Sequence, residues 1–265
     1  MPRKIARYGW VPDLPDHRDH VYSVPRHLAT ALPAKVDLRK SMPPVYDQGQ
    51  IGSCTANAIA GAIEFAMKKQ HEKAFVPSRL FVYWNERSME HTVHQDAGAQ
   101  IRDGIKVVNK LGAPPETVWP YDDTPADSNG TWPAGAKPAQ KPSPAAFKAA
   151  KLHQSVAYQS VPQTLSQVKG VLASGFPVVF GFTVYDAFES AAVAKSGVLD
   201  LPGPKEASIG GHAVLCVGYD DAAQRFTIRN SWGPKWGLKG YFTMPYAYLL
   251  DPNLADDLWV ITTME

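Results

Sequence analysis

The sequence predicts an α+β protein with two lobes, because helical and strand-like patterns occupy different halves of the chain. Apolar residues recur at helical spacing between residues 54 and 112. Runs rich in β-branched and aromatic residues dominate from residue 176 onward. With 265 residues and 45% hydrophobic content, the chain can bury a large core, either as one domain or as two lobes that share a cleft.

Three helices are expected in the first half of the chain. The first begins at Cys54, with Ser53 as its N-cap. The second begins after Ser78, and the third starts near Ile101 and closes at Gly112, a residue type common at helix ends. The first half is therefore expected to be mainly helical.

The remaining segments are expected to be an arm, a loop and a strand-rich region. Residues 1 to about 35 are polar and rich in proline, which favours an extended arm laid over a surface. Residues 122–146 are rich in proline, alanine and glycine, which favours a long surface loop between the lobes. One short helix is expected at 165–175, and strands are expected at 176–184, 212–219, 225–230, 240–244 and 258–262.

The charge and the apolar runs argue against two classes of partner. The net charge is +2, and the Lys and Arg residues are scattered rather than interleaved with aromatic residues, so no nucleic acid partner is expected. No stretch approaches the length of a membrane span, so no membrane partner is expected either. The N-terminus lacks the apolar core of a signal peptide, which predicts a cytoplasmic or non-classically exported protein.

No metal or organic cofactor is expected. His91 and His94 could form a metal pair, but no third ligand is evident and a solvated helix end explains them. The chain has no phosphate-binding glycine loop and no calcium-loop spacing of acidic residues. Its two cysteines, Cys54 and Cys216, are expected to remain thiols, because a thiol needed for catalysis cannot also form a disulfide.

Cys54, His212 and Asn230 stand in the chain order of a thiol acyl-transfer site. A nucleophilic thiol must ionise, and both a helix N-terminus and an imidazolium favour the thiolate. His212 would stabilise that thiolate and protonate the leaving amine, while Asn230 would orient its ring. Gln48 and the Cys54 N–H are candidate oxyanion donors, and Trp232 would shield the imidazole–amide bond from water. Each residue alone has a structural explanation, such as a buried core thiol, so only the combination indicates catalysis.

Three motifs together resemble those of the papain-like (C1) cysteine peptidases. Gln48 stands six residues before the cysteine in Gln-Gly-Gln-Ile-Gly-Ser-Cys54, as in the family's nucleophile motif. Two further motifs, His212-Ala213-Val214 and Asn230-Ser231-Trp232-Gly233, resemble its histidine strand and its asparagine motif. The resemblance runs from about residue 33 to the C-terminus.

The resemblance implies a papain-like two-lobed fold for residues 33–265, with the active-site cleft between the lobes. The helical lobe would cover roughly residues 45–120, and an antiparallel β-barrel-like lobe would cover roughly residues 150–250, with the N- and C-terminal segments crossing between them. Residues 1–32 would form an N-terminal arm or short propeptide-like segment.

Three departures from the family's pattern indicate a bacterial type of member. Ile51 replaces the usual cysteine three residues before the nucleophile, so the disulfide that this cysteine anchors is absent. Thr55 replaces the usual aromatic residue, and Gly211 replaces the usual Asp or Asn before the histidine. These changes argue against a secreted, lysosomal-type enzyme and favour a bacterial enzyme with a short N-terminal arm.

The function implied by the resemblance is that of a cysteine endopeptidase, which hydrolyses peptide bonds through an acyl-enzyme on Cys54 with His212 as general acid and base. Its partner would be a polypeptide substrate in extended conformation. The arm is hypothesised to pack across or beside the cleft and to limit access in cis. The substrate-binding candidates are Gly98 and Ala99 for backbone pairing, Gly181 and Ala213 for the pocket of the second residue before the scissile bond, and Gly211 beside the histidine.

Two alternatives remain on the same residues. A thiol acyltransferase or deamidase would pass the acyl group to an amine or act on a side-chain amide; the Asn-Ser-Trp-Gly setting favours hydrolysis over this. A non-catalytic binding homologue would keep the fold with its cleft permanently filled by the arm. The intact set of Gln48, Cys54, His212 and Asn230 argues against that second alternative.

Overall fold

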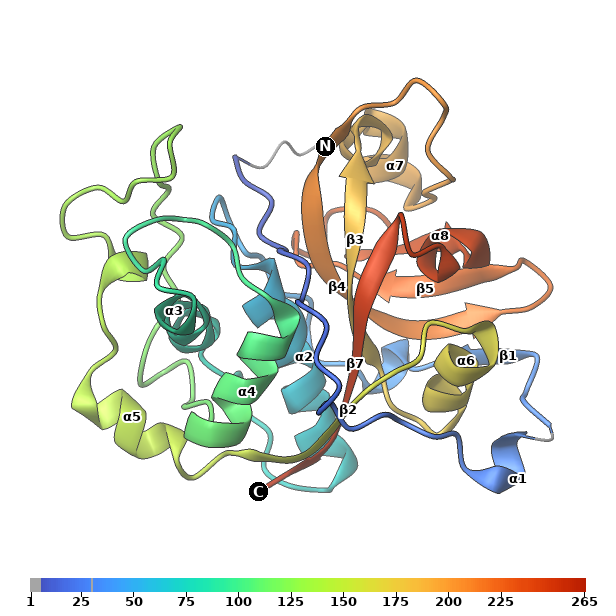
Figure 1. Ribbon diagram of the computed structural model, residues 1–265, viewed down its shortest axis with the longest axis horizontal. Coiled ribbons are helices and arrows are strands. Elements are labelled where there is room, and N and C mark those ends of the chain that lie inside the picture. Colours follow the sequence, from blue (N-terminus) through green and yellow to red (C-terminus); the bar gives the residue numbers. More distant parts are fainter. Residues whose placement is uncertain (1–5, 30) are drawn as a thin grey trace.

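The computed structural model describes residues 6–29 and 31–265, so residues 1–5 and 30 of the predicted arm lie outside the described residues. It has a helical half and a half built on an antiparallel sheet, which confirms the predicted α+β class (Figure 1). The helices are α1 Arg26–Ala29, α2 Cys54–Lys69, α3 Arg79–Met89, α4 Ile101–Leu111, α5 Pro144–Ala150, α6 Leu165–Ala173, α7 Ala191–Ser196 and α8 Tyr246–Leu250.

The three helices expected in the first half are confirmed, and α2 is the central one. Fourteen of its sixteen residues are buried, so it is packed on all sides rather than along one stripe. Ser78 caps α3 by accepting from the backbone N–H of Phe81 at 3.2 Å. Ser53 precedes α2 but makes no cap hydrogen bond, because its hydroxyl instead pairs with the hydroxyl of Tyr121 at 2.6 Å.

One seven-stranded sheet forms among the described residues. Its strand order is β2-β7-β3-β4-β5-β6, β1 pairs with β4, and every pair is antiparallel. The strands are β1 Lys35–Asp37, β2 Ser155–Ser160, β3 Val178–Tyr185, β4 Ser208–Asp220, β5 Arg225–Arg229, β6 Tyr241–Pro245 and β7 Ala255–Met264.

The prediction of one continuous loop over 122–146 is wrong at its end. Ser143 caps α5 by accepting from the Ala146 N–H at 3.2 Å, and Pro144 takes the first helical position, where its missing N–H costs nothing. The sequence reading also missed β2, an edge strand of the sheet that pairs with β7 and also forms a parallel bridge between its Ser160 and Val21 of the N-terminal segment.

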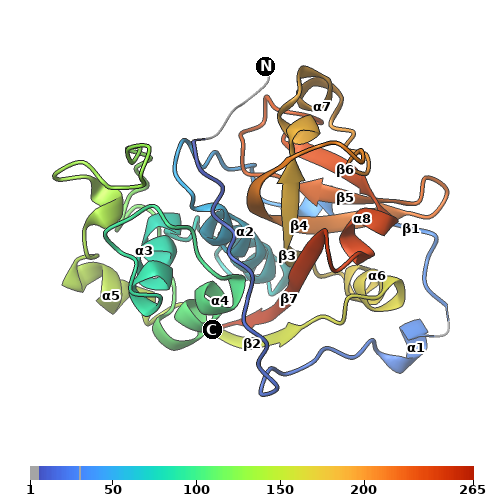
Figure 2. The ribbon, with the colours of Figure 1, turned by 45° about the horizontal axis from the view of Figure 1, so that its top comes forward.

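Two hydrophobic clusters form the core, one around α2, α3 and α4 and one around the sheet. The N-terminal segment runs between the helices and the sheet, as both ribbon views show in dark blue (Figures 1 and 2). Its Trp10 belongs to the helical cluster and is 9% exposed. Gly9 and Trp10 are therefore buried in the protein interior, whereas Ala6, Val11 and Pro12 on either side of them stay exposed.

Candidate active site

Cys54 is buried at the first position of α2. Its thiol receives hydrogen bonds from the backbone of Ala213 on β4, of Gly9 in the N-terminal segment and of Thr55. Burial is the larger effect and raises the pKa of Cys54 to about 12. With the N-terminal segment in place, the thiol is therefore protonated near neutral pH.

His212 lies on β4, fully buried and one residue before Ala213. Its Nε2 lies 2.8 Å from Oδ1 of Asn230, which can only accept, so Nε2 carries the proton in this bond. The same Oδ1 also accepts from the Ser231 N–H at 2.8 Å, which fixes the amide. The Trp232 ring is 5.4 Å from the imidazole centroid and 3% exposed, so it keeps water from this side of the pair.

Gln48 joins the segment before α2 to the turn that follows β5. Its backbone N–H donates to Ser231 O at 2.9 Å, and its Oε1 accepts from Ser231 Oγ at 2.6 Å. Its Nε2 donates one hydrogen bond to Ile51 O at 3.0 Å, and the amide nitrogen has a second N–H. The structure thus links Gln48, His212 and Asn230 by short contacts and brings Cys54 against the strand that carries His212.

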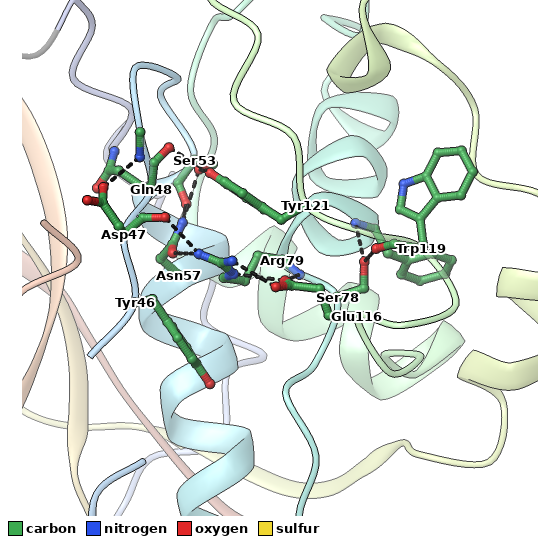
Figure 3. A network of polar contacts seen from close by, with 12 residues as sticks. Tyr46, Asp47, Gln48, Ser53, Asn57, Ser78, Arg79, Glu116, Trp119 and Tyr121 are labelled. Atoms are coloured by element: carbon green, nitrogen blue, oxygen red, sulfur yellow. Dashed lines mark hydrogen bonds and ion pairs between the residues drawn. The ribbon is translucent and has the colours of Figure 1, made fainter. Parts of the chain in front are cut away.

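Arg79 is a buried cation that the sequence reading missed, and it lies beside the segment that carries Gln48 (Figure 3). Arg79 Nη1 donates to Asp47 O and to Asn57 Oδ1, both at 3.0 Å. Its Nε and Nη2 donate to the two oxygens of Glu116 at 2.9 and 2.8 Å, in the forked geometry that suits a guanidinium. The cation therefore fixes the backbone immediately before Gln48.

Tyr121 fixes the same segment from its other side. Its ring lies 3.8 Å from the Arg79 guanidinium, and its hydroxyl donates to Gln48 O at 2.8 Å. The same hydroxyl contacts Ser53, which precedes the nucleophile helix (Figure 3). One polar cluster thus holds both Gln48 and the start of α2.

Replacing Arg79 by methionine is expected to lower the free energy of unfolding by about 3–5 kcal/mol, because it leaves Glu116 and several buried acceptors without their cation. Urea unfolding measures this change. The matched control is Arg39→Met, which breaks a more exposed pair with Asp37 and is expected to cost about 1 kcal/mol or less. Equal urea midpoints for the two variants would contradict a supporting role for Arg79.

Four of the five residues predicted to bind substrate, Gly98, Ala99, Gly181 and Gly211, meet residues 9–11 of the N-terminal segment. Ala99 N–H donates to Gly9 O at 2.8 Å and Ala99 O accepts from Val11 N–H at 3.0 Å. Trp10 N–H donates to Gly211 O at 2.9 Å. Gly98 has φ +74 and lies so close to Gly9 that a Cβ would stand 2.4 Å from its oxygen. Gly181 is the register partner of Ala213 in the β3–β4 pair.

The indole of Trp10 fills the space that these glycines leave. A Cβ at Gly181 would stand 2.0 Å from the indole, and one at Gly211 would stand 2.7 Å from it. The ring of Tyr8 packs edge-on against His212 with centroids 5.9 Å apart, and its hydroxyl donates to Glu189 at 2.8 Å. The sequence reading missed Tyr8 and Trp10, because a proline-rich polar segment gives no periodic signal that would identify them.

Further along the segment, the Asp13 carboxylate accepts from the Arg102 N–H at 3.1 Å and from Trp259 Nε1 at 3.0 Å. Arg102 also pairs with Asp19 at 2.7 Å. Burial raises the pKa of Asp13 to about 7, and the nearby carboxylate of Asp257 adds to the rise.

Two other sequence-derived features take no part in this site. His91 and His94 are exposed in the turn that follows α3, and within the described ranges no three His, Cys, Asp or Glu side chains gather as metal ligands. Cys216 is a second buried thiol, and burial raises its pKa to about 12. None of the helices in the described part of the chain is long and apolar enough to cross a bilayer.

Comparison with known proteins gives a consistent result. Residues 32–249 match the model of the papain family cysteine proteases. Xylellain, a cysteine protease from Xylella fastidiosa, is 48% identical, with a TM-score of 0.93 over 100% of this chain and 99% of that one. A peptidase C1-like protein of Acanthamoeba polyphaga mimivirus is 42% identical over 96% of this chain and 86% of its own length. A cathepsin B-like protein of Giardia intestinalis, CP3, is 30% identical over 81% and 69%, respectively. The chain therefore belongs to the papain family of cysteine proteases.

Proposed function

We propose that this papain-family cysteine protease is an endopeptidase that uses Cys54 as its nucleophile. The observation that carries the proposal is the 2.8 Å contact between His212 Nε2 and Asn230. His212 lies on β4, the strand that also contacts the Cys54 thiol. With Nε2 bound to Asn230, the exchange of a proton with the thiol falls to Nδ1. His212 takes the thiol proton, and the resulting imidazolium stabilises the thiolate.

The reaction then proceeds in two halves. The thiolate attacks the peptide carbonyl carbon, and the oxyanion accepts hydrogen bonds from the Cys54 backbone N–H and from the second N–H of the Gln48 amide. The C–N bond breaks, the amine leaves with the proton from His212, and an acyl-thioester remains. His212 next removes a proton from water, the hydroxide attacks the thioester, and the acid leaves as Cys54 recovers its proton.

The backbone groups that hold residues 9–11 are proposed to hold an extended substrate. Ala99 offers one donor and one acceptor to a peptide, and Gly211 offers an acceptor. The space beside Gly181 and Ala213 would take the side chain of the second residue before the scissile bond. Polypeptides are therefore the substrates, and the pocket that Trp10 fills would bind the side chain of the second residue before the scissile bond.

The N-terminal arm, residues 1–32, is proposed to inhibit the enzyme in cis. Trp10 fills the pocket while Gly9, on its N-terminal side, contacts the thiol. In a substrate, the residue at the thiol follows the pocket residue along the chain. In the arm, the residue at the thiol precedes the pocket residue. The arm therefore runs in the opposite direction to a substrate, and none of its peptide bonds is placed correctly for cleavage. The Tyr8 ring also covers His212. Residues 33–265 would then form the catalytic domain.

An epoxysuccinyl-peptide probe tests the nucleophile directly. We expect one covalent adduct by intact mass on the wild type and none on Cys54→Ala, because only a thiolate in a peptide-binding cleft reacts readily. The matched control is Cys216→Ala, which removes the other buried thiol and is expected to keep the adduct. A peptide blocked at both ends should be cleaved slowly by the wild type, whose arm fills the pocket, and faster by Trp10→Ala.

Two other results would each redirect the assignment. An adduct together with amine-dependent ligation products and no hydrolysis would indicate an acyltransferase. An adduct that persists on Cys54→Ala would remove Cys54 from the role of nucleophile.

A further inference from the structure

Asp96 joins two segments of the helical half: the nucleophile segment, residues 48–54, and the pairing loop, residues 96–99. The backbone N–H of Gly52 donates to both carboxylate oxygens of Asp96 at 3.0 Å. Ala99, three residues after Asp96, carries the backbone groups that pair with the arm. One carboxylate thus holds the nucleophile segment against the pairing loop.

Tyr83 of α3 makes a second link between the same two segments. Its hydroxyl donates to Oδ1 of Asp96 at 2.5 Å and accepts from the N–H of Gly98 at 3.2 Å. Burial raises the pKa of Tyr83 well above its ordinary value, and the charge of Asp96 adds to the rise, so the hydroxyl keeps the proton that it donates. A continuous chain of hydrogen bonds therefore runs from Gly52 through Asp96 and Tyr83 to Gly98.

Arg87, one turn further along α3, supports this chain of hydrogen bonds. Its guanidinium lies 4.1 Å from the centroid of the Tyr83 ring, and its Nη1 donates to Gln95 O at 3.1 Å. The backbone N–H of Asp96 itself donates to Gly130 O at 2.7 Å. Arg87 and Tyr83 are fully buried on a helix, so the carboxylate is held by rigid surroundings. None of these groups belongs to the arm, so release of the arm removes none of these hydrogen bonds.

The arm approaches the thiol between the two segments that Asp96 joins. A Cβ at Gly9 would stand 1.7 Å from Gly52 O, and a Cβ at Gly98 would stand 2.4 Å from Gly9 O. The backbone of Gly9 also forms a hydrogen bond with the Cys54 thiol. A peptide backbone at the thiol therefore contacts both segments, and their spacing decides how that backbone meets the sulfur.

No disulfide fixes this spacing. Both cysteines of the chain, Cys54 and Cys216, are free thiols. Ile51 stands at the position where the family pattern has a cysteine that anchors a disulfide. The hydrogen bonds from the next residue, Gly52, to the Asp96 carboxylate hold this segment instead.

We propose that Asp96 is a positioning residue that sets the spacing between the nucleophile segment and the pairing loop, and so places the scissile carbonyl of a bound peptide against Cys54. The inference rests on the proposed function, because it assigns Asp96 a part in the same reaction. Asp96 acts through Gly52 on one side and through Gly98 on the other. Its removal leaves the thiol and the imidazole in place but lets the two segments move relative to each other.

The test compares two reactions of Cys54 in the full chain with Trp10→Ala, in which the pocket is open. Cleavage of a peptide blocked at both ends requires contact with both segments, whereas alkylation by iodoacetamide requires only the thiol. Because a misplacement of about 1 Å can cost about 10²-fold in rate, Asp96→Ala is expected to lower kcat/KM for the peptide about 10- to 100-fold, with alkylation within about twofold of its parent. Both rates are taken per titrated thiol, so an unfolded fraction does not contribute.

Two milder variants separate positioning from folding. Asp96→Asn keeps an oxygen that accepts from the Gly52 N–H and is expected to recover most of the peptide activity. Tyr83→Phe keeps the ring beside Arg87 and removes only the hydroxyl, so it replaces Asp96→Ala in the test if that variant does not fold. It is expected to lower the peptide rate and not the alkylation rate.

The matched control is Asp251→Ala, which removes a carboxylate that accepts from the Asn253 N–H at 2.9 Å in the sheet half. This variant is expected to change neither rate. The combination of Asp96→Ala with Tyr83→Phe should cost less than the product of the two separate losses, because both changes interrupt the same chain of hydrogen bonds.

An Asp96→Ala enzyme with unchanged kcat/KM, or one in which peptide cleavage and alkylation fall by the same factor, would overturn this inference, while cleavage by the Trp10→Ala parent upholds the proposed function. Absence of peptide cleavage by that parent would instead overturn the proposed function, and this inference with it.

Discussion

Replacing His212 by alanine is expected to lower kcat/KM for peptide hydrolysis about 1,000-fold or more. The variant loses the group that takes the thiol proton and the group that protonates the leaving amine, and each general acid–base step contributes about 10²–10⁴-fold. Cys54 would then keep the high pKa that its burial causes, without an imidazolium to lower it. Alkylation of the variant by iodoacetamide should therefore require a higher pH than alkylation of the wild type.

Two further variants make this result specific to His212. His94→Ala removes an exposed histidine in the turn that follows α3 and is expected to leave kcat/KM unchanged. Asn230→Ala removes the acceptor that orients the imidazole but keeps the imidazole itself, so a smaller loss than that of His212→Ala is expected. A His212→Ala enzyme within tenfold of the wild type, with the same pH dependence of alkylation, would remove His212 from the mechanism.

The secondary structure that carries Cys54 and His212 could be predicted from the sequence, because it depends on the types and order of nearby residues. A helix start at Cys54 follows from the apolar spacing of α2, and a strand through His212 follows from the apolar run of β4. The proximity of Gln48, His212 and Asn230 came from the family resemblance of their motifs, since no local pattern specifies contacts across 183 residues, such as that between Gln48 and Ser231.

The arm contacts and the buried cation were beyond the reach of the sequence for the same physical reason. Trp10 and Asp257 are 247 residues apart, and the bulge in β7 beside Asp257 depends on the pairing of β7 with β3. Arg79 looks like a polar residue in the first turn of a helix, yet its side chain is buried by a tertiary cluster. Propensity and periodicity report local conformation and cannot specify such partners.

Replacing Trp10 by alanine is expected to increase the rate of labelling by the epoxysuccinyl probe about 10- to 100-fold. Truncating a buried tryptophan costs about 3–5 kcal/mol, and here that cost falls on the docked arm rather than on the rest of the fold. The change also removes the hydrogen bond to Asp257. The matched control is Leu14→Ala, which truncates an exposed arm residue and is expected to label at the wild-type rate.

The advantage of Trp10→Ala over the wild type should shrink as pH rises. Burial raises the pKa of Asp13 to about 7 and that of Asp257 to about 6, so the docked arm binds protons that the released arm gives up. Because these carboxyls have a raised pKa only in the docked arm, their protonation stabilises docking. This stabilisation is fully present below the ordinary carboxyl pKa of about 4 and is lost as pH rises through 6–7. The neighbouring charge of Asp256 adds to the rise in the pKa of Asp257. Arg102, which pairs with Asp19, lowers the pKa of both Asp13 and Asp257. Labelling rates of both proteins at pH 5 and 7.5 test this, and a ratio that stays constant or grows with pH would show that these carboxyls do not control the arm.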